Sequence, residues 1–163
     1  MALEPVFRPF RTDDTNKICE IAVKAWEPIY DAYRQDMGDK FFNHLYGNWQ
    51  DVKRKQIEEK SQKSPEEIYV SELDGTIVGF TSFYLDMDKM IGVIGNNAVA
   101  PEYQGHGIGQ MQHRQVLEIF KQKGMLYATV TTGLDDGHAK ARKSYERAGF
   151  KRMTWNISYF QEL

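Results

Sequence analysis

The sequence has little cysteine and no long apolar run. Cys19 is the single cysteine among 163 residues, so an internal disulfide and a thiolate metal cluster are excluded. We expect no metal, and we expect Cys19 to be a small buried residue on a helix. No apolar run approaches the ~18 residues of a membrane span, and the opening stretch MALEPVFRPFRTDD lacks the apolar core of a signal peptide. We therefore expect a cytoplasmic protein with no membrane partner.

The chain also lacks an excess of charge of either sign. Its 21 Lys and Arg residues against 23 Asp and Glu residues give a net charge of -2, unlike the basic surfaces by which proteins hold nucleic acid. We expect no nucleic-acid partner. A length of 163 residues suits one domain with a sizeable core. The default expectation is a single domain over residues 1–163 that handles a small molecule.

Hydrophobic periodicity indicates a helical zone in the first part of the chain. After a strand expected at residues 5–10, apolar residues recur at helical spacing from Ile18 onward, within residues 13–62. Gly38 and Gly47 interrupt this zone, which predicts two or three helices.

Beyond Pro65 the pattern becomes that of strands alternating with helices. Asp74-Gly75 is a strong hairpin signal between two alternating segments. The elements expected after Pro65 are strands at 67–73, 76–85 and 90–100, a helix to about 123, a strand at 125–132, a helix from about 137 to 148 and a last strand at 151–160. This order predicts an α/β (α+β) fold with antiparallel strands early and a crossover later.

Three glycines at alternate positions, Gly105, Gly107 and Gly109, stand between the third of these strands and a helix. A Walker A loop needs Lys after its last glycine, and the dinucleotide pattern G-x-G-x-x-G needs glycine at position 110, where the chain has Gln110. Two interpretations remain. The glycines make only a tight turn, or they let an anion approach the free amides at a helix start.

Two stretches resemble the GNAT superfamily of N-acetyltransferases. Gln104 to Gly109, in the pattern V-x-P-x-x-Q-G-x-G-I-G, is similar to the acetyl-CoA loop of that family, and ARKSYERAGF at residues 141–150 is similar to its second signature. The resemblance implies a mixed, largely antiparallel central sheet with helices on both faces. It also implies an acceptor side in the helices at about 13–62 and an acetyl-CoA core at about 90–150.

The resemblance further implies roles for particular residues. Main-chain groups of Ala98 and Val99 are expected to hold the acetyl and pantetheine end, and Tyr145, predicted to face inward, is expected to protonate the departing CoA thiolate. His138, where many relatives carry asparagine, is expected to contact the CoA arm. Lys140, Lys143 and Arg147 fall on the opposite helix face, which we expect to be solvated. The amides expected to cradle the pyrophosphate belong to Gln104, Gly105, His106, Gly107, Ile108 and Gly109.

The acceptor side is less specific. Acetyl transfer from acetyl-CoA to a primary amine of a small molecule or peptide is the expected reaction, with a homodimer as one further partner that the resemblance allows. No residue identifies itself as the base. The candidate acceptor-side residues are Trp26, Glu27, Tyr30, Asn96 and Asn97. Two alternatives stay open: a non-catalytic acyl-CoA-binding sensor on the same fold, and an interaction domain whose glycines only turn the chain.

Overall fold

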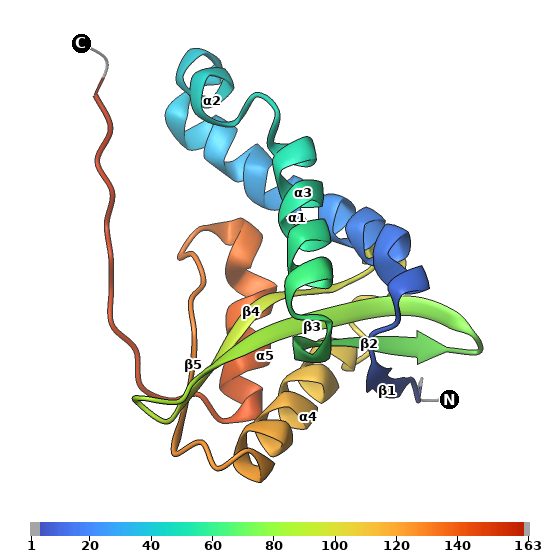
Figure 1. Ribbon diagram of the computed structural model, residues 1–163. Coiled ribbons are helices and arrows are strands. Elements are labelled where there is room, and N and C mark those ends of the chain that lie inside the picture. Colours follow the sequence, from blue (N-terminus) through green and yellow to red (C-terminus); the bar gives the residue numbers. More distant parts are fainter. Residues whose placement is uncertain (1–3, 162–163) are drawn as a thin grey trace.

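Five strands form one sheet in chain order in the computed structural model, which describes residues 4–161 (Figure 1). Neighbouring strands pair antiparallel, except that β4 and β5 pair parallel. This mixed, mostly antiparallel sheet confirms the expected fold class. The strands are β1 (Val6–Pro9), β2 (Ile68–Leu73), β3 (Thr76–Asp86), β4 (Ile91–Val99) and β5 (Tyr127–Val130). Domain bounds of 1–163 stay a prediction, because residues 1–3 and 162–163 lie outside the described part.

Three helices form the predicted helical zone, and the first and third of them cover one face of the sheet. They are α1 (Thr15–Met37), α2 (Asp39–Tyr46) and α3 (Trp49–Lys63). Gly38 separates the first two with a φ of 77°, which glycine adopts without strain, and Gly47 follows the second, as the sequence predicts. Cys19 and Ile18 of α1 and Ile57 of α3 are buried against Phe80 of the sheet.

The opposite face of the sheet is covered by α4 (Ile108–Gln122) and α5 (Ala139–Ala148) (Figure 1). Val116 and Phe120 of α4 pack against Phe83 and Ile94 of the sheet. The apolar face of this helix therefore packs on the sheet. Short 3₁₀ turns complete the chain: η1 (Thr12–Asp14), η2 (Pro65–Glu67), η3 (Pro101–Tyr103) and η4 (Asp136–His138).

A bulge in β4 changes which residues face which helices. Phe83 pairs with Ile94, but Thr81 pairs with Asn97, so β4 has one extra residue in this interval. An extra residue reverses the alternation of side chains beyond it. Ile94 consequently packs on the α4 side, whereas Ala98, four residues on, packs with α1 on the other side.

The two parallel strands part after a short contact. The β4–β5 register runs from Ile91↔Tyr127 to Ile94↔Val130 and ends there. The second half of β4, residues 95–99, therefore keeps β3 on one edge and has no β5 partner on the other. This parting of the strands is where the candidate site lies.

The prediction of a last strand at residues 151–160 is wrong. The segment has no strand or helix, its side chains are exposed, and Figure 1 shows it running apart from the sheet. Apolar residues do alternate in this segment, at Met153, Trp155 and Ile157, but all three side chains are exposed. However, a strand needs a hydrogen-bonded neighbour, and no strand within residues 4–161 pairs with this segment. The alternation alone could not supply that neighbour.

Across residues 4–161, none of the helices combines the length and the apolar character needed to cross a bilayer.

The packing of α4 depends on Gly92. A Cβ at this position would overlap the Phe120 ring, so Gly92→Ala should lower the free energy of unfolding by about 1–3 kcal/mol. Urea denaturation measures this change. The smaller side chain of Phe120→Leu in the Gly92→Ala background should recover part of the loss, and an unchanged midpoint for Gly92→Ala would contradict this packing.

Candidate active site

A cavity of about 980 Å³ opens where β4 and β5 part. Its walls come from residues 95–99 of β4, the loop that leads into α4, the inner side of α5 and the middle of α1. Thr131 and Thr132, just after β5, line the opposite side of the opening. The cavity thus lies at the carboxyl ends of two parallel strands, a common position for ligand sites in such sheets.

The glycine loop forms one end of this cavity. Gly105 and Gly107 have φ values of 85° and 82°, so their backbone conformations favour glycine. Gly107 is the residue before α4 and has no side chain to cap the helix, so the first amides of α4 lack intrahelical acceptors. The Ile108 side chain is buried and anchors the start of the helix. The loop therefore presents main-chain donors rather than side chains.

The main chain at the end of β4 is directed into the opening. Ala100 donates its N–H to the Val78 carbonyl of β3 at 2.8 Å. Successive residues of a strand direct their main-chain groups to opposite edges, so the Val99 N–H is directed to the open edge. On that edge the Val99 carbonyl accepts a hydrogen bond from Gln104 Nε2 at 3.0 Å. The Val99 amide is thus a donor toward the cavity.

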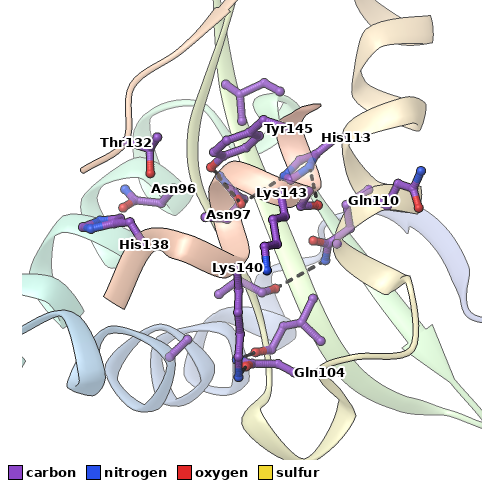
Figure 2. A pocket seen from close by; sticks show the side chains of 18 of the residues that line it. Asn96, Asn97, Gln104, Gln110, His113, Thr132, His138, Lys140, Lys143 and Tyr145 are labelled. Carbon is purple, nitrogen blue, oxygen red and sulfur yellow. Dashed lines mark hydrogen bonds between the residues drawn. The ribbon is translucent and has the colours of Figure 1, made fainter. Parts of the chain in front are cut away.

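Tyr145 is buried in the wall of the cavity and belongs to a polar network (Figure 2). Asn97 Nδ2 donates to the Tyr145 hydroxyl oxygen at 3.0 Å. His113 Nε2 lies 3.1 Å from Asn97 Oδ1, and Ser144 Oγ lies 3.1 Å from His113 Nδ1. Burial raises the pKa of the Tyr145 hydroxyl, which keeps it protonated at neutral pH.

Protonation of His113 fixes the direction of this network. Burial lowers the pKa of His113 to about 4, so the ring is neutral and carries one N–H. Asn97 Oδ1 can only accept, so Nε2–H donates to it and Nδ1 accepts from Ser144. Asn97 consequently turns its NH₂ toward Tyr145. The Tyr145 hydroxyl in turn donates to Asn97 Oδ1 at 3.4 Å, a long contact from which its proton can turn to a ligand in the cavity.

Most residues predicted for the site do line the cavity. The predicted residues among the lining set are Trp26, Asn96, Asn97, Ala98, Val99, Gln104, Gly105, Gly107, Ile108, Gly109, His138 and Tyr145. Three others lie outside that set. Glu27 and His106 are exposed, and the Tyr30 ring stacks on Trp49 with centroids 4.2 Å apart.

The basic residues of α5 divide into two groups. Lys140, Lys143 and Arg147 are exposed, as expected for a solvated face, and also line the cavity. Arg142 instead donates to the carbonyls of Gly133 and Asp135, at 2.7 and 2.8 Å, and so fixes the loop before α5.

A carboxylate fixes the ring of His138. Its Nδ1 lies 2.7 Å from the Asp135 carboxylate, which leaves Nε2 as the free nitrogen.

Sequence reasoning missed His113 and Ser144. The signal for His113 was available, because it lies on the core-facing side of α4 beside the buried residues Gln112 and Val116. A polar residue at such a position has to be hydrogen-bonded. Within residues 4–161, no three His, Cys, Asp or Glu side chains gather as metal ligands.

Comparison with known proteins identifies the family of this chain. Residues 26–150 match the model of the acetyltransferase (GNAT) family. A mycothiol acetyltransferase of Stackebrandtia nassauensis is 32% identical over 103 residues, which is 61% of this chain and 33% of the relative. The chain therefore spans about a third of the length of that relative.

Solved structures share the fold at low sequence identity. The PaiA N-acetyltransferase of Thermoplasma acidophilum, in complex with coenzyme A, has a TM-score of 0.71 and 20% identity, with 94% of each chain covered. A GNAT family acetyltransferase of Brucella melitensis, in complex with acetyl-CoA, has a TM-score of 0.62 and 21% identity, covering 97% of this chain and 92% of the other.

The buried neutral state of His113 predicts a loss of stability in acid. Its folded pKa of about 4 lies below the ordinary ~6.5, so the unfolded chain binds more protons between these values. Stability is fully present above pH ~6.5 and falls as the pH drops toward ~4, by about 2 kcal/mol between pH 7 and pH 5. Urea denaturation at both pH values should find this difference reduced in His113→Gln. The control His44→Gln, at an exposed site, should retain it, and an equal pH dependence in both variants would contradict the assignment.

Proposed function

Because the chain belongs to the acetyltransferase (GNAT) family, we propose that it transfers an acetyl group from acetyl-CoA to a primary amine. The acceptor is a small molecule or peptide, and the amine attacks directly within a ternary complex. The observation that carries the proposal is the cavity between β4 and β5, because it combines an open strand edge, a glycine loop and Tyr145.

The glycine loop suits the pyrophosphate of acetyl-CoA. The unsatisfied amides at a helix start and the helix dipole favour an anion there, and Gly105 and Gly107 expose the main chain to the cavity. Lys140, Lys143 and Arg147 on the rim add positive charge for the phosphates. The solved relatives that hold coenzyme A or acetyl-CoA support this choice of cosubstrate.

The end of β4 suits the acetyl group. The Val99 N–H at the open edge donates to the thioester oxygen and stabilises the negative charge that develops there when the amine adds to the carbonyl carbon. The thioester is already activated, so the transfer requires neither a metal nor a covalent enzyme intermediate. The open edge of β4 thereby orients the carbonyl for attack.

Tyr145 suits the role of general acid. As the C–S bond breaks, the hydroxyl proton of Tyr145 passes to the thiolate sulfur, and the amine loses its proton to solvent. A thiol with pKa ~8.5 and a phenol with pKa ~10 are close enough for this transfer. The hydrogen bond from Asn97 stabilises the tyrosinate that forms. A cytoplasmic location and a homodimer stay predictions.

Gly107→Glu tests the cofactor loop. The variant places a carboxylate where the pyrophosphate is expected, so like-charge repulsion should weaken acetyl-CoA binding by about 10-fold or more. Isothermal titration calorimetry measures the change. Gly75→Glu is a matched control, since Gly75 has a φ of 77°, lies in the β2–β3 turn and, like Gly107, has open space around a built Cβ. If the two variants bound acetyl-CoA with equal affinity, the glycine loop would not be part of the binding site.

Tyr145→Phe tests the general acid. We expect kcat to fall by about 10²-fold, with the Kd of acetyl-CoA changed less than about 2-fold, in a CoA-release assay over polyamines, amino acids, aminoglycosides and peptide N-termini. Tyr127→Phe, at a residue 69% exposed on β5, is the control and should leave turnover unchanged. Turnover of Tyr145→Phe that matches wild type across pH would falsify this role.

A further inference from the structure

A buried lysine stands behind the acceptor end of the cavity. Lys53 of α3 is 7% exposed. Its Nζ donates to Gln56 Oε1 at 2.9 Å and to Asn96 Oδ1 at 3.1 Å, and it lies 4.3 Å from the centroid of the Trp26 ring. Within residues 4–161 these are its partners, and no carboxylate is among them. A buried cation without a counter-ion is costly, so this arrangement requires an explanation.

Lys53 fixes the orientation of two side-chain amides. An ammonium group can only donate, and an amide has an accepting oxygen and a donating NH₂. With both oxygens bound to Lys53, the NH₂ groups of Asn96 and Gln56 are turned away from it. Both residues line the main cavity and a second, adjoining cavity of about 200 Å³. Neither NH₂ group has a hydrogen-bond partner within the described residues.

The charges around these two amides also favour an anionic ligand. Among the residues that line the second cavity none is acidic, and Lys60 there is already neutralised by its ion pair with Glu67. In the main cavity Asp136 is the one acidic lining residue of the described chain, and it lies in η4, in the wall formed with α5. This end of the site therefore offers two NH₂ donors, a cation behind them and no negative charge. Such a set matches a carboxylate, which accepts hydrogen bonds and carries the missing charge.

We propose that the acceptor is an amine that also bears a carboxylate, and that the NH₂ groups of Asn96 and Gln56 bind this carboxylate with Lys53 as its counter-ion. The inference rests on the proposed acetyl transfer and names the substrate class. Asn96 precedes Val99, whose N–H is proposed to bind the thioester oxygen, by three residues, or ~10 Å of extended chain. The Asn96 side chain and the acetyl group occupy part of this span, so only a few carbon atoms separate the amine from the carboxylate. Polyamines and aminoglycosides, which carry several positive charges, are poor acceptors at this site.

The protonation of Lys53 is compatible with this role. Burial lowers the pKa of Lys53 to about 8, so most of the side chain is still charged at pH 7. An anion bound beside it favours the charged form further. Lys53 thus acts through Asn96 and Gln56, as a positioning residue and a counter-ion.

Matched acceptors test the inference. Each set contains an α-, β- or γ-amino acid, its primary amide and its decarboxylated amine, and CoA release is compared at equal concentrations of neutral amine. With wild-type protein at pH 7, kcat/KM for the amino acid should exceed that of both partners by about 10-fold or more. Equal or higher values for the amides or the decarboxylated amines would overturn the inference while leaving acetyl transfer intact. This comparison needs no variant.

Variants then assign the discrimination to Lys53. Lys53→Met should lower kcat/KM for the amino acids by about 10-fold or more and change the values for the decarboxylated amines less than about 3-fold, so that the preference disappears. Lys53→Arg should keep part of the preference, because it keeps the charge. Lys55→Met, at an exposed position of the same helix, is the control and should behave as wild type. An equal loss for all three kinds of acceptor in Lys53→Met would show a structural role only and overturn the assignment.

A binding measurement separates this inference from the proposed function. N-acetyl amino acids and their amides are titrated calorimetrically into the CoA-saturated protein, and the carboxylate forms should bind about 10-fold more tightly. If no amine is acetylated but this preference is present, the transfer reaction is refuted and the carboxylate site stands. If amines are acetylated and the preference is absent, the carboxylate site is refuted and the transfer reaction stands.

Discussion

The parting of β4 from β5 is the constraint on which the site depends. After Ile94 the second edge of β4 has no β5 partner, and strand alternation directs the Val99 N–H to that free edge. An unpaired main-chain donor in a strand interior is costly unless a ligand or water satisfies it. The glycine loop and α5 close the two ends of the same opening. One interruption of strand pairing thus creates both the cavity and its main-chain donors.

Polar groups on the two faces of β4 have different roles in the site. Toward α4 and α5, neutral His113 orients Asn97, whose NH₂ donates to the Tyr145 hydroxyl oxygen. Toward α3, charged Lys53 donates to Asn96 Oδ1, so the Asn96 NH₂ is turned away from the ammonium group. In each case a buried titratable group fixes an amide, and the amide presents its donors. The protonation states of these two groups, one neutral and one charged, set the hydrogen-bonding character of the two sides.

Local signals in the sequence predicted much of the fold and the glycine loop that lines the cavity. Gly38, the Asp74-Gly75 hairpin and the glycine loop each reflect a backbone conformation that few residues adopt, so a single sequence is enough to identify them. Long-range contacts were not predictable in this way. Residues 151–160 have strand alternation without a paired strand, Tyr30 packs in an aromatic cluster, and the network around His113 joins residues 16 and 31 positions away.

A crystal structure with bound acetyl-CoA tests the central claim most directly. The account predicts that the thioester oxygen lies within hydrogen-bond distance, about 3 Å, of the Val99 nitrogen, with the sulfur close to the Tyr145 hydroxyl and the pyrophosphate on the amides of residues 104–109. Acetyl-CoA bound away from the opening between β4 and β5, or a thioester oxygen that contacts other donors while the Val99 N–H is paired with protein, would contradict it.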